Sequence, residues 1–135
     1  MPDTAPQIFV LQTIVPGQGT AGTDDEFVLG EVPFAGTVTA ASYTTDAAIM
    51  GHASNNRIFS VINAGAAGSG TASVATVTSN ASNSFTAFDE KALDLSGTAA
   101  NLTVAAGDIL KFKSDAQASG VADPGGVVQV TISRS

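Results

Sequence analysis

The chain has 135 residues, and its twelve acidic and five basic side chains give a net charge of −7. This length suits a single domain with a core of its own. The absence of cysteine excludes disulfides, thiolate metal sites and cysteine nucleophiles. The basic residues are widely spaced, whereas nucleic acids and anionic membranes require clustered positive charge, so neither is an expected partner.

The N-terminal segment is expected to be an extended arm over residues 1–7, because it contains two prolines and no apolar period. Ile8–Val15 is rich in apolar and β-branched residues and is predicted to form the first strand, which ends at Pro16-Gly17. We therefore predict two parts: an N-terminal arm with the first strand over residues 1–15, and a β-sandwich domain over residues 16–135.

The remainder of the chain alternates short apolar runs with turns rich in Gly, Asn and Ser. Near residue 111 the alternation is that of a half-buried strand. Lys111 and Lys113 are expected to face water, and Leu110 and Phe112 are expected to face the core. Eight or nine such strands predict an all-β, jelly-roll-like β-sandwich, with one helical turn over Thr45–Met50. The further strands are expected at Glu26–Glu31, Gly36–Ser42, Arg57–Asn63, Thr71–Thr78, Ser84–Phe88, Asn101–Val104, Ile109–Lys113 and Val127–Ser133.

His52 is the single histidine, and a Ser-His-Asp triad would need it as the general base. The sequence has no Gly-x-Ser-x-Gly nucleophile motif, so we interpret His52 as a loop residue. The glycine-rich run Gly65–Gly70 lacks the Gly-Lys-Ser/Thr ending of a phosphate-binding loop and is predicted to be a hairpin loop.

Two acidic clusters are candidates for binding or catalysis. Asp24-Asp25-Glu26 offers oxygen ligands for calcium, but consecutive strand residues point to opposite faces, so a solvated strand entrance is expected. Asp89-Glu90 with Asp94 offers the carboxylate pair of glycoside chemistry. The neighbouring Phe85 and Phe88 are interpreted as core residues. We therefore predict no enzymatic activity and assign no catalytic, cofactor-binding or metal-binding residue.

Several turn-and-strand patterns follow one another in a particular order between Glu31 and Ser133, which is most of the chain. This order resembles the small jelly-roll head-decoration proteins, also called head-stabilising or cement proteins, of tailed bacteriophages. The patterns consist of turns and strands and include no catalytic signature. They are Val32–Tyr43, Asn55–Asn63, Gly68–Thr71, Val104–Leu110 and Pro124–Val130.

The resemblance implies a homotrimer that binds the major capsid protein on the outer surface of a phage capsid and stabilises the shell against the pressure of packaged DNA. The virion is then its expected location, after assembly in the host cytoplasm. In such proteins an extended N-terminal segment often pairs with the shell. An apolar strand behind a proline-rich arm suits strand addition, in which main-chain hydrogen bonds provide the affinity. The expected capsid-binding residues are Gln7, Ile8, Phe9, Val10 and Leu11.

Two other function classes remain open. A receptor- or carbohydrate-binding jelly-roll module of a phage fibre or lectin would need an exposed aromatic residue or an Asp/Asn cluster in a distal loop. The candidates for that cluster are Asn55-Asn56 and Asn80–Asn83. A hydrolase would need a convergent acid, base or nucleophile set, and one histidine with scattered acids does not provide it.

Overall fold

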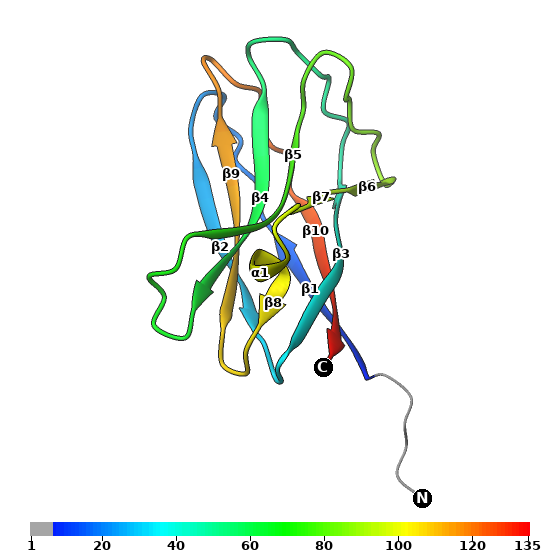
Figure 1. Cartoon of the computed structure of the whole chain (residues 1–135). Helices are drawn as coiled ribbons and strands as arrows, with labels where there is room; N and C mark the ends of the chain where they lie inside the picture. Colours follow the sequence, from blue (N-terminus) through cyan, green and yellow to red (C-terminus); the bar gives the residue numbers. More distant parts are fainter. Residues whose placement is uncertain (1–6) are drawn as a thin grey trace, which may run out of the picture.

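The computed structural model describes residues 7–135, so the arm expected over residues 1–7 lies outside the described residues except for Gln7. Within this range the chain is all-β, and two antiparallel sheets pack as a sandwich (Figure 1). The all-β sandwich predicted from the sequence is therefore confirmed. No helix among the described residues is long and apolar enough to cross a membrane.

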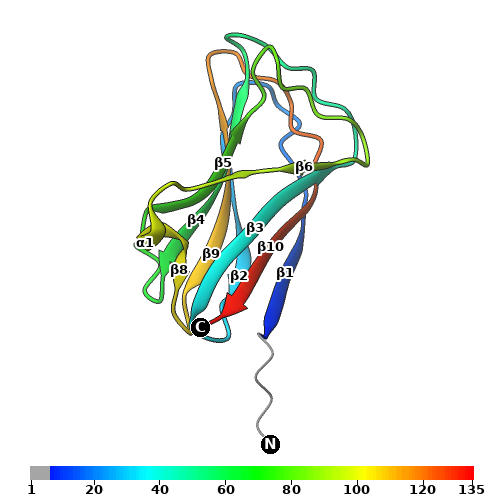
Figure 2. The ribbon, with the colours of Figure 1, turned by 45° about the vertical axis from the view of Figure 1, so that its right-hand side comes forward.

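Each sheet mixes strands that are distant in the sequence (Figure 2). Sheet A contains, in spatial order, β1 (Ile8–Val15), β10 (Gly126–Arg134), β3 (Gly36–Thr45) and β6 (Glu90–Ala92), and β8 (Thr103–Val104) also pairs with β3. Sheet B contains, in spatial order, β2 (Asp25–Glu31), β9 (Ile109–Ala116), β4 (Arg57–Gly65), β5 (Ala72–Thr78) and β7 (Asp94–Leu95).

Alternation of apolar and polar residues places one face of each central strand between the sheets. Val128, Val130 and Ile132 of β10 are at most 1% exposed. Leu110 and Phe112 of β9 are fully buried, and the lysines that alternate with them lie on the outer face, as predicted. Both lysines form ion pairs there. The two inward faces together make one continuous core.

Four aromatic rings form the centre of this core. The ring of Phe59 lies with its centroid 5.2 Å from that of Tyr43, 5.2 Å from that of Phe85 and 5.9 Å from that of Phe112. All four side chains are at most 2% exposed. Because the rings come from both sheets and from the loop after β5, this cluster connects the two layers and one end of the sandwich.

The helical turn expected over Thr45–Met50 is wrong. Thr45 is the last residue of β3, and Ile49 forms an isolated antiparallel bridge with Phe85. The two residues exchange backbone hydrogen bonds of 3.0 and 2.8 Å, so pairing with a distant loop replaces local helical bonds. A short helix, α1 (Ala99–Leu102), contains the first two residues of the strand expected at Asn101–Val104, and the last two residues form the strand β8 as expected.

The strand expected at Ser84–Phe88 is also wrong, since only Phe85 pairs there. Phe85 is buried, as expected, whereas Phe88 is 80% exposed and the expectation that it lies in the core is wrong. The backbone of Phe88 adopts φ 62°, in the left-handed region. That conformation costs an L-residue about 1–2 kcal/mol, and it turns the side chain away from the core at the end of the loop.

Candidate functional site

The residues expected to bind a capsid, Gln7–Leu11, lie at the start of β1 but do not share one face. Ile8 and Val10 point outward and are 58% and 43% exposed. Phe9 and Leu11 point inward and pack against the core. The backbone carbonyl of Gln7 accepts a 2.8 Å hydrogen bond from the backbone N–H of Arg134, so the segment is fixed to the sandwich.

The outward side chains of β1 belong to a larger uncharged surface. They pair across the sheet with outward residues of β10, because directly opposed residues of antiparallel strands share a face. We call this surface the β1–β10 face. It carries no charged side chain. Its residues are Ile8, Val10, Gln12, Ile14, Val127, Gln129, Thr131 and Ser133.

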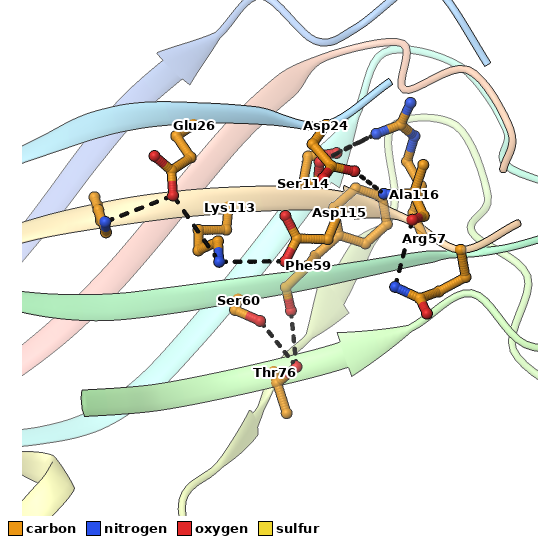
Figure 3. Close-up of polar contacts among 12 residues, drawn as sticks. Asp24, Glu26, Arg57, Phe59, Ser60, Thr76, Lys113, Ser114, Asp115 and Ala116 are labelled. Atoms are coloured by element: carbon orange, nitrogen blue, oxygen red, sulfur yellow. Dashed lines mark hydrogen bonds and ion pairs between the residues drawn. The ribbon is translucent and has the colours of Figure 1, made fainter. Parts of the chain in front are cut away.

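The outer face of sheet B is charged. The Nζ of Lys113 lies 3.9 Å from Oε1 of Glu26 and 3.4 Å from Oδ2 of Asp115, and the Nζ of Lys111 lies 3.5 Å from the same Glu26 oxygen (Figure 3). Beside these pairs the hydroxyls of Ser60 and Thr76 bond to each other at 3.1 Å. The two outer faces of the molecule therefore differ sharply in polarity.

The strands at the sheet edges also differ. Natural edge strands are shielded from unwanted pairing by charge, proline, bulges or shortness. β2 has acidic residues and a register shift between Val28 and Gly30, and β6, β7 and β8 are two or three residues long. β1 has eight residues without charge, proline or glycine, and its pairing with β10 has no register shift. Among the described strands, β1 is the long edge without such protection.

A separate polar cluster of buried side chains lies at one end of the sandwich. Arg57 is 0% exposed, and its Nε donates to the backbone carbonyl of Val121 at 2.5 Å. Its Nη1 donates to the carbonyl and the hydroxyl of Ser114 at 3.2 and 3.1 Å, and its Nη2 donates to the carbonyl of Thr20 at 3.2 Å. Figure 3 shows Arg57 beside Ser114. These bonds satisfy a buried guanidinium with neutral acceptors.

Asp123 completes this cluster from the loop between β9 and β10. Its Oδ1 accepts hydrogen bonds from the hydroxyl of Tyr43 at 2.5 Å and from the backbone N–H of Gly125 at 3.0 Å. Its Oδ2 accepts from the hydroxyl of Ser114 at 2.9 Å. Tyr43 belongs to sheet A and Ser114 to sheet B, so the carboxylate connects both layers. Because the four side chains that form the cluster (Arg57, Tyr43, Ser114 and Asp123) are at most 2% exposed, we interpret the cluster as structural.

Tyr43 gives this cluster a pH dependence. Burial, followed by the negative charge and hydrogen bond of Asp123, raises the pKa of the Tyr43 hydroxyl far above its ordinary value. The unfolded chain ionises this group near pH 10, so its contribution to stability is complete below pH 10 and is lost as the pH rises further. We expect the difference in unfolding free energy between wild type and Tyr43→Phe to shrink by about 1.4 kcal/mol per pH unit above pH 10.

Urea unfolding of both proteins between pH 8 and 11 measures this difference, and lysine titration cancels between them. A difference that stays constant over this range would contradict the assignment.

His52 has a local structural role. Its side chain is exposed, and Nδ1 accepts hydrogen bonds from the backbone N–H groups of Ser54 at 3.0 Å and Asn55 at 2.8 Å. These bonds shape the loop between β3 and β4. No serine hydroxyl is hydrogen-bonded to His52 within residues 7–135, so a Ser-His-Asp triad is not assembled there.

The loop asparagines of the carbohydrate hypothesis are also engaged locally. The Nδ2 of Asn56 donates to the carbonyl of His52, and the Oδ1 of Asn55 accepts from the N–H of Ser119. The Oδ1 of Asn80 accepts from Ser82, and the Nδ2 of Asn83 donates to the carbonyl of Thr78 at 2.8 Å. Their polar groups therefore support the loops in which they lie.

The acidic clusters do not converge on a metal centre. Among residues 7–135, no group of three or more His, Asp or Glu side chains is arranged to hold a metal ion. Asp24 accepts a 2.8 Å bond from the N–H of Ala116, and Glu26 pairs with the two lysines of β9. An open hollow of about 450 Å³ is lined by Asp24, Asp25, Glu26, Lys113 and Asp115. Asp94 lines another hollow of about 310 Å³, which neither Asp89 nor Glu90 lines.

Gly65–Gly70 connects the antiparallel pair β4 and β5, so the predicted hairpin loop is confirmed. Sequence reasoning missed Arg57, Asp123 and Phe88. Arg57 was visible as the one charged residue in an otherwise apolar strand, whereas Asp123 had the appearance of an ordinary turn residue before Pro124. The sequence around Phe88 gave no signal of a left-handed backbone.

Comparisons with protein-family models, with curated proteins and with solved structures find no match to this chain.

Proposed function

We propose that the chain is a structural protein of a phage virion that binds the major capsid protein on the outer surface of the capsid and stabilises the shell against internal DNA pressure. The sequence resemblance to head-decoration proteins favours this function. The jelly-roll description and the homotrimer are part of the same proposal. The single structural observation that carries it is the unprotected edge of β1, which is the place where a partner strand would extend sheet A.

The surroundings of β1 define the chemistry of that partner strand. β1 and β2 lie together at one side of the sandwich, where the hydroxyl of Thr13 donates to the carbonyl of Leu29 at 2.6 Å. A Cβ atom on Gly30 would lie 2.6 Å from Cδ1 of Leu11, so glycine permits this close approach. β2 contributes Asp25, Glu26 and Glu31. A strand beside β1 therefore meets apolar side chains and nearby acids, which favours an uncharged or basic partner strand.

The uncharged β1–β10 face suits a flat contact with a shell. Its polar groups are hydroxyls and amides, which lose less free energy than ions when water is removed. Repetition of the contact over a lattice raises the effective concentration of each further contact. The net charge of −7 does not prevent trimer formation, because salt screens charges beyond about 8 Å at physiological ionic strength.

Co-sedimentation with mature, DNA-free capsids of the phage that encodes the chain tests the proposal. We expect wild type to sediment with expanded capsids and the double variant Ile8→Lys/Val10→Lys to bind about tenfold more weakly or less, since two charges would be buried at the contact. The matched control is the double variant Ala53→Lys/Ala81→Lys, because both alanines are exposed in the loops that follow β3 and β5, away from β1 and β2. It should bind like wild type.

Failure of wild type to sediment with the capsids would overturn the capsid function. Equal binding by the double variant would overturn the location of the contact at β1. Thermal unfolding checks that each variant is folded. Light scattering tests the trimer, and a chain that is monomeric both in solution and on the capsid would contradict it.

A receptor-binding module is the second candidate function, and the exposed aromatic ring of Phe88 in the loop after β5 is the observation that favours it. Saturable glycan binding without capsid binding would support this alternative.

A further inference from the structure

Within residues 7–135, the large apolar side chains that are exposed fall into two groups. Ile8, Val10, Ile14 and Val28 lie on β1 and β2, at the side discussed above. The others, Met50 and Phe88, lie in the loops over residues 46–56 and 79–89, which we call the distal loop pair. These loops lie at the end of the sandwich opposite the C-terminus and the start of β1 (Figures 1 and 2).

Phe88 is held in place although its ring is not packed. Its backbone N–H donates to the carbonyl of Thr45 at 2.9 Å, and the N–H of Asp89 donates to the carbonyl of Thr86 at 3.2 Å. These bonds fix a left-handed backbone that disfavours any residue with a Cβ atom. A phenylalanine at this position therefore stabilises the fold neither through its backbone conformation nor through burial of its ring. It does present an aromatic group on a fixed backbone, which lowers the entropy cost of binding a partner.

The loop that carries Met50 is equally well fixed. The preceding residue, Ile49, is buried and bridges to Phe85. The following residue, Gly51, donates to the hydroxyl of Ser84 at 2.9 Å, and a Cβ atom there would lie 2.0 Å from the carbonyl oxygen of Asn80. Hydrogen bonds and close packing therefore hold the two loops together. Met50 is 81% exposed on this fixed backbone.

The charges in the distal loop pair and the adjoining β6 are mainly negative. Asp46, Asp89 and Glu90 are exposed, whereas the single lysine, Lys91, places its Nζ 5.5 Å from the centroid of the Phe85 ring. Anionic lipid is therefore disfavoured, and a partner with a basic rim is favoured. A second copy offers little of this chemistry, because Arg57 is buried and the lysines of β9 are paired with acids. Arg134 is exposed, but its guanidinium lies 5.2 Å from the centroid of the Phe34 ring and donates to the side chain of Gln7.

We propose that Phe88, supported by Met50, anchors a protein partner other than the capsid shell, through an apolar pocket on the partner that is surrounded by Lys and Arg side chains. Phenylalanine and methionine are enriched at protein interfaces, and a few aromatic anchors provide most of the binding energy there. This contact uses the end of the molecule away from the start of β1, so it is independent of the proposed capsid contact.

A random-peptide display selection on the immobilised full chain tests the proposal. We expect the selected peptides to combine apolar residues with Lys or Arg, and a synthetic copy of the strongest to bind wild type saturably in calorimetry. Phe88→Ala should weaken that binding about tenfold or more, and Met50→Ala should weaken it less. Val28→Ala, a matched truncation on β2, should bind like wild type.

A selection without enrichment, or peptides that bind Phe88→Ala as tightly as wild type, would overturn the proposal. A glycan array on which wild type binds and Phe88→Ala does not would also overturn it, in favour of a sugar site. Because none of these assays contains a capsid, their failure leaves the outcome of the sedimentation experiment unaffected.

Discussion

Replacement of Asp123 by alanine is expected to lower the free energy of unfolding by about 3–5 kcal/mol. The carboxylate accepts hydrogen bonds from the side chains of Tyr43 and Ser114 and from the backbone of Gly125. Its removal leaves these donors without their acceptor at a site that is only 2% exposed, and a buried donor without a partner costs free energy. It also removes the negative charge that accepts a hydrogen bond from the Ser114 hydroxyl. This hydroxyl in turn accepts a hydrogen bond from the buried guanidinium of Arg57.

Urea unfolding of Asp123→Ala and wild type at pH 7 measures this loss. Asp89→Ala is the matched control, since Asp89 is exposed in a loop and its truncation should change stability by no more than about 0.5 kcal/mol. Asp123→Asn should fall between the two, because one carbonyl oxygen remains. Equal stabilities for Asp123→Ala and Asp89→Ala would show that the buried cluster does not hold the sheets together.

Replacement of Phe59 by alanine is expected to cost about 3–5 kcal/mol. The ring is 0% exposed and lies against three other aromatic rings from both sides of the sandwich. Its truncation leaves a cavity that the neighbours close only partly, because Tyr43 is also fixed by its hydrogen bond to Asp123.

Phe88→Ala provides the internal comparison for this substitution. The same atoms are removed from a side chain that is 80% exposed, so the change in unfolding free energy should stay within about 0.5 kcal/mol. Thermal and urea unfolding of both variants measure the contrast. Similar losses of unfolding free energy at the two positions would mean that the packing of Phe59 in the aromatic cluster does not stabilise the core.

Strands were predictable where one face is buried and the other is solvated. The alternation in β9 and β10 follows from this requirement and gave both the strands and their inward residues. The sequence around Thr45–Met50 and Phe88 has no such constraint. Its conformation depends on the pairing of Ile49 with Phe85, residues that are distant in the sequence, and local pattern contains no information about that pairing.

The position of the candidate site along the chain was predictable, but the prediction treated residues that point outward and residues that point into the core as one binding segment. The apolar run Ile8–Leu11 indicated a strand, and period two implies that alternate residues point inward, so Phe9 and Leu11 are core residues. The sequence does not give the order of the strands in each sheet, so it could not show that β1 is an edge strand without protective features. The Arg57–Asp123 cluster depends on β3, β4, β9 and the loop between β9 and β10 meeting at one end, which sequence spacing does not specify.

The different polarity of the two outer faces gives the molecule a preferred orientation at any boundary between protein and water. Sheet B carries Lys111, Lys113 and their acidic partners, so it keeps its hydration when the opposite side is covered. Neighbouring copies in a layer would then all turn the same side outward. If the chain coats a capsid as proposed, the hydrated ion pairs of sheet B would form the outer surface of that layer and would oppose association between coated particles.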